Sequence, residues 1–552
     1  MIPQFSILPA TTWLRIVWLP LVCCAAWLGS ASRPAWCQAT ITVDIVDEKS
    51  GQPIPCRVEL RDAKGRAQKT RGGLNIPPWS IVDGKFVFRG RAGDYEFDVS
   101  QGPEYAKGGG GFTLDRDGEG TDVVRLPRHA DMASEGWYAG DLLACVSAKE
   151  AGQWLSAEGL HMTAIIASPA ALAVPTALAS PAAPSPPPAT TAPAKPATGA
   201  SVKAAGVVDN ASITTPHVDQ LRDTRWCNVG SYYDDRPGSG LLLHNWQPPA
   251  AVPAGVPSSR LLTMAKQNAN THAEIVRLWA RDAPVWLASG RIDSIQILSE
   301  HVTRDGRTSI KLGDMFHPEP GLFKGPRGPG RLVENLYWQV LESGLQIPPS
   351  AGSAVGRSTS PLGYNRVYVA QPSAQRSDAT WWEALRAGRS IVTNGPLLRA
   401  TVNGQLPGHT FQVDSGAKLM LDIALQLTVA DPVEYVDVVF NSDAIYHARL
   451  DEYAKQGGKI PALEITESGW LVIRVVTQRE ETYRLATTAP YYVRLDGQTR
   501  VSRRACEMFS NWLESSISEQ QRVDPAGAKA AAPYTSAAQK FWRDRINTAT
   551  SP

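Results

Sequence analysis

Two histidines and a glutamate near the middle of the chain have the residue types and the spacing of metal ligands. His272 and Glu274 form an HAE triplet, and His301 follows Glu300 shortly after the apolar segment 291–298. Alternate residues of a β-strand point to the same side, so His272 and Glu274 would project together from a strand. Imidazole and carboxylate groups bind zinc, iron and manganese, and such a metal lowers the pKa of a bound water and polarises an ester. These three residues are candidate ligands of a hydrolytic metal site.

A short stretch a quarter of the way along the chain supplies further candidates. Residues 136–145 read GWYAGDLLAC, and an expected helix at 148–158 and an apolar strand at 162–167 follow. The stretch resembles the start of the metallohydrolase domain of the CehA/McbA family, a branch of the polymerase and histidinol phosphatase (PHP) superfamily. In that family it reads GWYxGDLHxH, and the two histidines bind metal. Leu143 and Cys145 stand at those two positions here.

The resemblance covers most of the chain and implies both a fold and a site. Segments 282–295, 343–356, 361–369 and 385–408 match family regions in order. The implied fold is a distorted, incomplete (β/α) barrel of PHP type. The implied cofactor is divalent zinc, iron or manganese if the protein is active, and none otherwise. The positions that match metal-site positions of the family are Asp141, His161, His272 and His301.

Each candidate histidine also has a structural interpretation. A single histidine at a strand end is more often hydrogen-bonded within the fold than bound to a metal. The sequence favours this interpretation for His161 and for His244, which lies in LLLHNW, and leaves the two interpretations even for His272 and His301.

The residues of the GWYAGDLLAC stretch are equally open to two interpretations. Leu143 cannot bind a metal. Cys145 could bind zinc as a thiolate, but beside Leu143 and Val146 it is more simply a small buried apolar side chain. Asp141 could cap the turn that follows it. The chain contains no GxSxG elbow, Walker loop, HExxH or CxxC pair that would indicate another chemistry.

The pattern along the chain predicts a multidomain α/β plus β protein, with the PHP-like barrel flanked by N- and C-terminal β-sandwich domains. Residues 40–128 alternate as half-buried strands do and predict a β-sandwich of about seven strands. Residues 134–395 alternate helix and strand patterns and predict the α/β domain. Segment 168–206, rich in Ala and Pro, interrupts that domain and is expected to be a disordered insertion. Residues 396–500 predict a second β-sandwich. Residues 501–552 predict a polar, partly disordered tail, apart from a candidate helix around 537–545.

The N-terminus has the pattern of a secretory signal. Arg15 is the only charged residue in the first 28, and the apolar run 16–28 and small residues follow it. That run is shorter than the roughly 20 residues that span a bilayer. We expect segment 1–39 to be cleaved after Ala39 and the protein to be exported to the periplasm or the exterior, with no integral membrane segment left. An uncleaved anchor is the alternative.

Composition limits the partners. The chain has 55 Lys and Arg against 53 Asp and Glu, a balance that gives no reason to expect nucleic acid as a partner. An unidentified small molecule or protein remains as the ligand. Whether Cys145 and Cys227 form a disulfide is open.

The two altered histidine positions decide the functional prediction. We expect an exported protein of the metallohydrolase type whose eroded metal site leaves it weakly active or inactive, acting as a binding scaffold. The alternative is an active hydrolase of an ester or phosphoester with a reduced metal site built on His272, Glu274 and His301.

Overall fold

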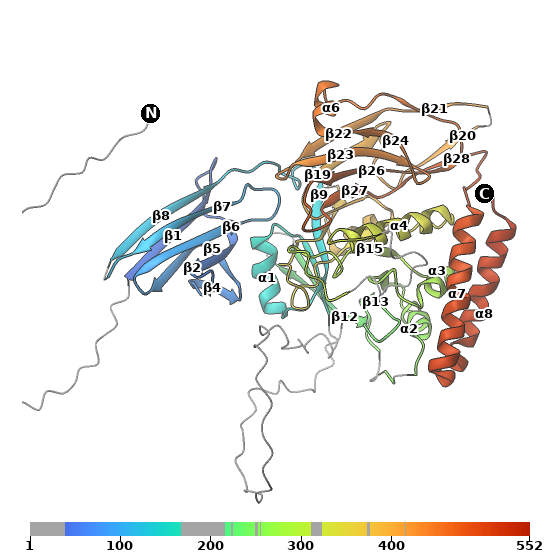
Figure 1. Ribbon diagram of the computed structural model, residues 1–552, viewed down its shortest axis with the longest axis horizontal. Coiled ribbons are helices and arrows are strands. Elements are labelled where there is room, and N and C mark those ends of the chain that lie inside the picture. The colour runs from blue at the N-terminus through green and yellow to red at the C-terminus, as the bar shows by residue number, and fades with distance from the viewer. Residues whose placement is uncertain are drawn as a thin grey trace, which may run out of the picture.

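The fold combines one separate β unit with a large mixed sheet, its covering helices and a C-terminal pair of long helices (Figure 1). The structure is a computed structural model that describes residues 39–116, 118–166, 216–221, 225–248, 252–253, 255–310, 323–372, 376–414 and 416–552. The predicted signal up to residue 38 and the Ala/Pro-rich segment 168–206 lie outside these residues. In the described residues, every helix is too short or too polar to cross a membrane.

The N-terminal β unit, residues 39–126, is one curled sheet around a core of its own. Its strand order is β7-β6-β2-β5-β1-β8, with β3 on β2 and β4 on β5. A Cβ on Gly108 of β7 would collide with the side chains of Leu126 and Val124 of β8, so the two edges of the sheet approach each other. The strict burial alternation of β1 confirms the expected half-buried strands, but the predicted sandwich of two sheets is a single hydrogen-bonded sheet. The strands are β1 (Ala39–Asp47), β2 (Pro55–Asp62), β3 (Ala67–Gln68), β4 (Arg71–Ile76), β5 (Trp79–Gly90), β6 (Gly93–Ser100), β7 (Gly108–Leu114) and β8 (Glu119–Leu126).

The middle of the chain forms an α/β unit, as predicted. Strands β9, β10, β12, β14, β15 and β16 run parallel, and β13 is antiparallel between β12 and β14. Val355, just after β16, bridges to Ala144 at the end of β9, so the sheet curves until strands distant in its order meet. The elements are β9 (Trp137–Ala144), α1 (Ala148–Ala157), β10 (Met162–Ile166), β11 (His217–Leu221), β12 (Arg225–Asp234), β13 (Leu241–His244), α2 (Ser258–Ala265), β14 (His272–Ile275), α3 (Ala283–Ala288), β15 (Ser294–Leu298), α4 (Gly328–Glu342), β16 (Pro349–Ala351), β17 (Arg366–Ala370), α5 (Asp378–Arg386) and β18 (Ser390–Thr393).

The helix after the GWYAGDLLAC stretch shows how local sequence sets an element. Ser147 accepts from the backbone N–H of Glu150, and the Glu150 side chain accepts from the Ser147 N–H, which completes a capping box. Trp154 and Leu155 bury the inner face of α1. The helix therefore begins and ends within a residue of the predicted bounds.

The C-terminal β unit, residues 397–495, shares its main sheet with the α/β unit. Strand β18 pairs with β27, and the same sheet continues through β26, β23 and β24. The predicted boundary at residue 396 is therefore not a boundary between sheets, because the pairing of residues 391–393 with 486–488 cannot be seen in local patterns. Strands β19 and β22 form a second layer, since their apolar side chains join those of β23 and β26 in one core. The elements are β19 (Leu397–Val402), β20 (Thr410–Val413), β21 (Leu419–Leu421), β22 (Ile423–Thr428), β23 (Val433–Phe440), β24 (Asp443–Ala448), α6 (Leu450–Lys455), β25 (Leu463–Ile465), β26 (Gly469–Thr477), β27 (Leu485–Thr488) and β28 (Tyr491–Leu495).

The predicted candidate helix around 537–545 is confirmed within a longer helix, but the rest of the tail, predicted to be loose, is helical as well. Helices α7 (Arg503–Val523) and α8 (Pro525–Asn547) form an antiparallel hairpin that lies beside α3 (Figure 1, red). Phe509 and Trp542 stack at 4.9 Å between ring centroids, and the indole N–H of Trp542 donates to the Pro284 carbonyl at 3.1 Å. The two helices are polar except for one stripe, and that stripe is buried against the α/β unit.

The hairpin is expected to contribute to the stability of the whole protein. Trp542→Ala removes a fully buried indole and should lower the free energy of unfolding by about 3–5 kcal/mol. The matched control is Val523→Ala on the same hairpin, because Val523 is 65% exposed and its loss should change stability by less than about 0.5 kcal/mol. Urea unfolding measures both. Equal stabilities of the two variants would show that the hairpin does not pack as described.

Candidate functional site

The HAE triplet lies in a buried polar network on the inner side of the curved sheet. Glu274 Oε1 accepts from the Ser294 hydroxyl at 2.8 Å and from the Ser350 hydroxyl, and Oε2 accepts from Gln296 Nε2 at 2.7 Å and from His244 Nε2 at 3.2 Å. All five side chains are inaccessible to solvent. Each carboxylate oxygen thus has two donors, which is what a carboxylate needs to lie in the interior without a counter-ion.

The hydrogen bonds of Ser294 determine which ring nitrogen of His272 carries the hydrogen. The single hydroxyl hydrogen of Ser294 goes to Glu274, so Ser294 Oγ accepts from His272 Nε2 at 2.7 Å. Nδ1 of His272 then has a bare lone pair, and it has no partner among the described residues. Burial lowers the pKa of His272 well below its usual value, and the neighbouring His244 acts in the same direction. The ring of Trp382 lies 4.6 Å from His272 and 4.9 Å from His244, between centroids.

His301 is not part of this network. Strands β14 and β15 are parallel, with Glu274 opposite Ser294, and His301 lies beyond the end of β15 while His272 begins β14. The two histidines therefore lie at opposite ends of the strand pair. His301 Nε2 donates to the Ile297 carbonyl at 3.2 Å, its ring packs on Trp279 at 4.9 Å between centroids, and burial lowers its pKa to about 4.

The Asp141 carboxylate accepts hydrogen bonds from three backbone N–H groups. Its Oδ1 accepts from the N–H groups of Ser353 at 2.9 Å and Leu143 at 3.2 Å, and its Oδ2 accepts from the N–H of Gly363 at 2.6 Å. The carboxyl is fully buried, and burial raises its pKa to about 6 despite these hydrogen bonds. Asp141 thus ties β9 to the loop that follows β16.

Leu143, which stands where the GWYxGDLHxH motif has its first histidine, makes apolar contacts. Leu143 is fully buried in what we call the strand-end cluster, and a Cβ on Gly352 would collide with Leu143 Cβ. Cys145, half-buried at the edge of the cluster, is a free thiol whose pKa burial raises to about 12, so it is held as the uncharged thiol. The strand-end cluster consists of Leu143, Ile166, Tyr233, Leu242, Val276 and Ala354.

Charged side chains surround the Tyr233 edge of this cluster. The Tyr233 hydroxyl donates to Glu300 Oε1 at 3.1 Å, and Arg277 Nε donates to the same oxygen at 2.5 Å. The guanidinium carbons of Arg277 and Arg357 lie 5.7 and 5.3 Å from the centre of the Tyr233 ring. Burial alone would raise the pKa of Glu300, but Arg277 and Arg357 outweigh it and hold the pKa below its usual value.

His161 lies apart from these groups, before β10. Its ring contacts Tyr138 edge-on at 5.1 Å between centroids, and burial followed by the charge of Arg225 lowers its pKa to about 3. Nδ1 has no partner among the described residues.

The donor set does not fit the divalent metal that the resemblance implies. Leu143 offers no lone pair, the oxygens of Asp141 and Glu274 already accept backbone and side-chain hydrogens, and His301 is distant from His272. In the part of the chain that the structure describes, no three His, Cys, Asp or Glu side chains are grouped so as to hold a metal ion.

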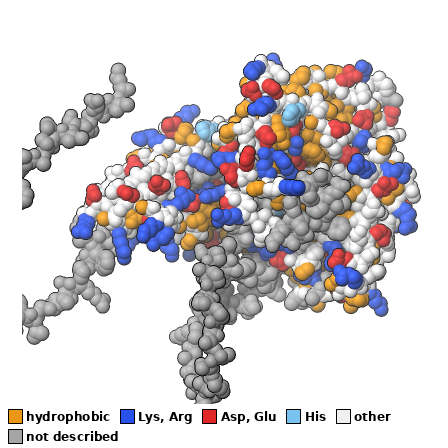
Figure 2. Space-filling model, in the orientation of Figure 1, with side chains coloured by type: hydrophobic (Ala, Val, Ile, Leu, Met, Phe, Trp, Pro, Cys, Tyr) orange, Lys and Arg blue, Asp and Glu red, His pale blue; other side chains and the backbone are white. Residues whose placement is uncertain are grey.

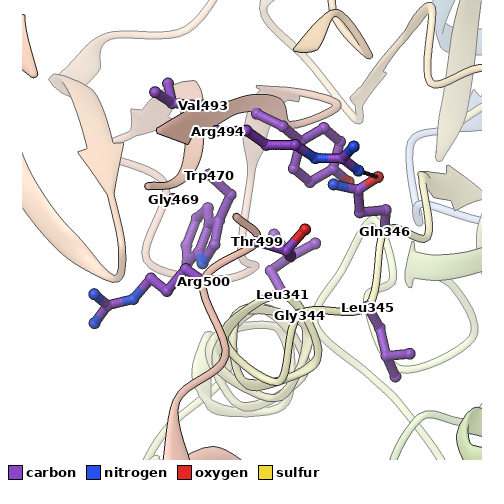
Figure 3. Close-up of a pocket in the computed structure, with 11 residues that line it drawn as sticks. Leu341, Gly344, Leu345, Gln346, Gly469, Trp470, Val493, Arg494, Thr499 and Arg500 are labelled. Atoms are coloured by element: carbon purple, nitrogen blue, oxygen red, sulfur yellow. Dashed lines mark hydrogen bonds between the residues drawn. The ribbon is translucent and has the colours of Figure 1, made fainter. Parts of the chain in front are cut away.

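The cavity drawn in Figure 3 is too small for a substrate. It lies between the end of α4 and strands β26 and β28, beside Trp470, and the Arg494 guanidinium donates to Gln346 Oε1 at 3.2 Å across it. Its free volume is about 10 Å³, which is room for one water molecule at most.

Comparison with protein-family models, with curated proteins and with solved structures found no match for the chain.

Several members of the Glu274 network were not among the sequence candidates. Ser294 and Gln296 alternate with Ile295 and Ile297 in a strand that is otherwise apolar. Polar residues at every second position of a buried strand indicate a polar layer inside a sheet, and that signal was available. The contribution of Ser350 depends on the pairing of β16 with β15, which local sequence does not reveal.

A histidine introduced at residue 143 should destabilise the protein. Leu143→His puts an imidazole among the apolar side chains of the strand-end cluster, and we expect the free energy of unfolding to fall by about 2–4 kcal/mol. Leu143→Met, the control of similar volume, should cost less than about 1.5 kcal/mol. Urea unfolding with and without added zinc measures both. Recovery of the His variant by zinc would show that co-ligands do surround residue 143.

Proposed function

We propose that the chain is an exported, non-hydrolytic protein of the CehA/McbA type that acts by binding a ligand. The observation that carries the proposal is the packing of Leu143 in the strand-end cluster, at the position where the GWYxGDLHxH motif has its first metal-binding histidine.

The family part of the proposal rests on the GWYAGDLLAC stretch and its setting. The stretch forms β9 and leads into α1 and the parallel strand β10. The sheet that follows is mostly parallel and curves until Val355 reaches Ala144. These features favour a distorted, incomplete barrel of PHP type.

The chemistry supports a binding role rather than hydrolysis. A metal-dependent hydrolase needs open coordination positions at which a water can be activated. Asp141 and Glu274 use their oxygens in hydrogen bonds that hold the sheet and its loops together, and Cys145 is held as a thiol. The alternative, a reduced metal site on His272, Glu274 and His301, is disfavoured because His301 lies at the other end of the strand pair.

Metal content of the secreted or periplasmic protein tests the proposal. We expect far less than one zinc, iron or manganese ion per chain by mass spectrometry, and no hydrolysis of nitrophenyl phosphate or nitrophenyl acetate when any of these metals is added. Stoichiometric metal that is lost in Glu274→Gln or His301→Ala, but kept in the control His129→Ala, would establish the hydrolase instead. His129 is an exposed residue outside the network, so its loss should leave any such site intact.

A further inference from the structure

A cavity of about 540 Å³, within the range of small-molecule binding sites, lies where the three units meet. The N-terminal β unit contributes Lys107, the α/β unit contributes Arg304 and Tyr364, and the C-terminal β unit contributes Arg484. Lys and Arg side chains gather in this region of the surface (Figure 2, blue, centre).

Buried carboxylates around the cavity are each shared between two guanidinium groups. Glu158 accepts from Arg57 Nε at 2.6 Å and lies 3.8 Å from Arg366. Asp431, directly after Ala430 of the lining, pairs with Arg484 at 2.8 Å and with Arg479.

The same sharing occurs on the wall formed by β2. Glu59 pairs with Arg304 at 3.1 Å and with Arg61 at 2.8 Å. The lining holds six Lys and Arg side chains against five Asp and Glu side chains, and the five arginines are all in ion pairs with carboxylates. Lys107 is the remaining basic side chain, and an oxyanion is the ligand that its charge would attract.

Lys107 is the cation without a counter-ion. It is exposed to the cavity, and it has no hydrogen-bond or ion-pair partner among the described residues. Partial desolvation, and then the charge of Arg484, lower the pKa of Lys107, while the charge of Asp431 acts in the opposite direction.

The loop that carries Lys107 is held against the α/β unit. Gly102 has a φ of +68°, and a Cβ there would meet the Glu158 carbonyl at 2.5 Å. This close approach, which only glycine permits, fixes the loop before β7 at the end of α1. The backbone of this loop is therefore held beside the cavity, which Gly102 and Lys107 both line.

We propose that this cavity binds a small molecule bearing an oxyanion, a carboxylate or a phosphate, whose negative charge is met by Lys107 together with Arg57, Arg304 and Arg484. This inference deepens the proposed binding function and rests on it. The Tyr364 ring, over which the Arg484 guanidinium lies at 5.9 Å, supplies a flat surface for the uncharged part of the ligand. A macromolecule is disfavoured because the site is a cavity between the three units rather than an open face.

Three sugars with the same ring test the charge requirement. Glucose 6-phosphate carries a phosphate, glucuronate carries a carboxylate, and glucose is the neutral control. Calorimetric titration of the intact protein should show millimolar or tighter binding of at least one of the two anions, weakened by added salt, and none of glucose. Lys107→Met should weaken that binding at least about tenfold, the loss of one charge-assisted contact. Lys64→Met, a lysine in an exposed turn of the same β unit, should bind as the unaltered protein does.

The outcomes separate this inference from the proposed function. Failure of both anions to bind, binding of glucose at equal strength, or unchanged binding in Lys107→Met would each overturn the oxyanion site. Release of inorganic phosphate from glucose 6-phosphate in the same samples would instead contradict the non-hydrolytic role while leaving the site in place. A thermal melt of Lys107→Met at the unaltered temperature shows that any loss of binding is local.

Discussion

The carboxylate of Glu274 is the constraint on which the inner side of the sheet depends. Its direct or shared hydrogen bonds reach Ser231 on β12, His244 on β13, Ser294 and Gln296 on β15, and Ser350 on β16. An acidic group in the interior is costly unless every lone pair is met. The strands must therefore keep the register that brings these donors to one point, and the curvature of the sheet is held with them.

Asp141 holds loop backbone in place by accepting hydrogen bonds, as Glu274 holds the strands. Its three backbone donors come from β9 and from both ends of the loop between β16 and β17. In a metal site, carboxylates in such places would exchange these donors for a cation. In this chain the oxygens of both carboxylates accept hydrogen bonds from protein groups, and Leu143, whose N–H donates to Asp141, is buried in the strand-end cluster.

Local sequence predicted what depends on local contacts. The helical spacing of Trp154 and Leu155 predicted α1 closely, and strand alternation placed His272 and Glu274 on one side. The stripe of Phe509, Trp512 and Leu513 has helical spacing, but the many polar residues around it led to the prediction of a loose tail.

Long-range contacts account for the other differences. His301 was grouped with His272 because both lie near strands, whereas the parallel pairing of β14 and β15 separates them. The cavity around Lys107 unites three units, and its lining spans residues 57–484. The spacing of residues in the sequence does not indicate that these segments lie together. Only the position of Lys107 in the cavity lining distinguishes it from other lysines.

The proposed non-hydrolytic role requires Glu274 and Asp141 to be hydrogen-bond acceptors that hold the fold rather than metal ligands. Anomalous diffraction from crystals grown with zinc and, separately, with manganese tests it most directly. We expect Glu274 to keep Ser294, Ser350, Gln296 and His244 as its partners and no anomalous peak to lie inside the curved sheet. A peak at a coordination distance of about 2.0–2.2 Å from an oxygen of Glu274 or Asp141 would contradict it.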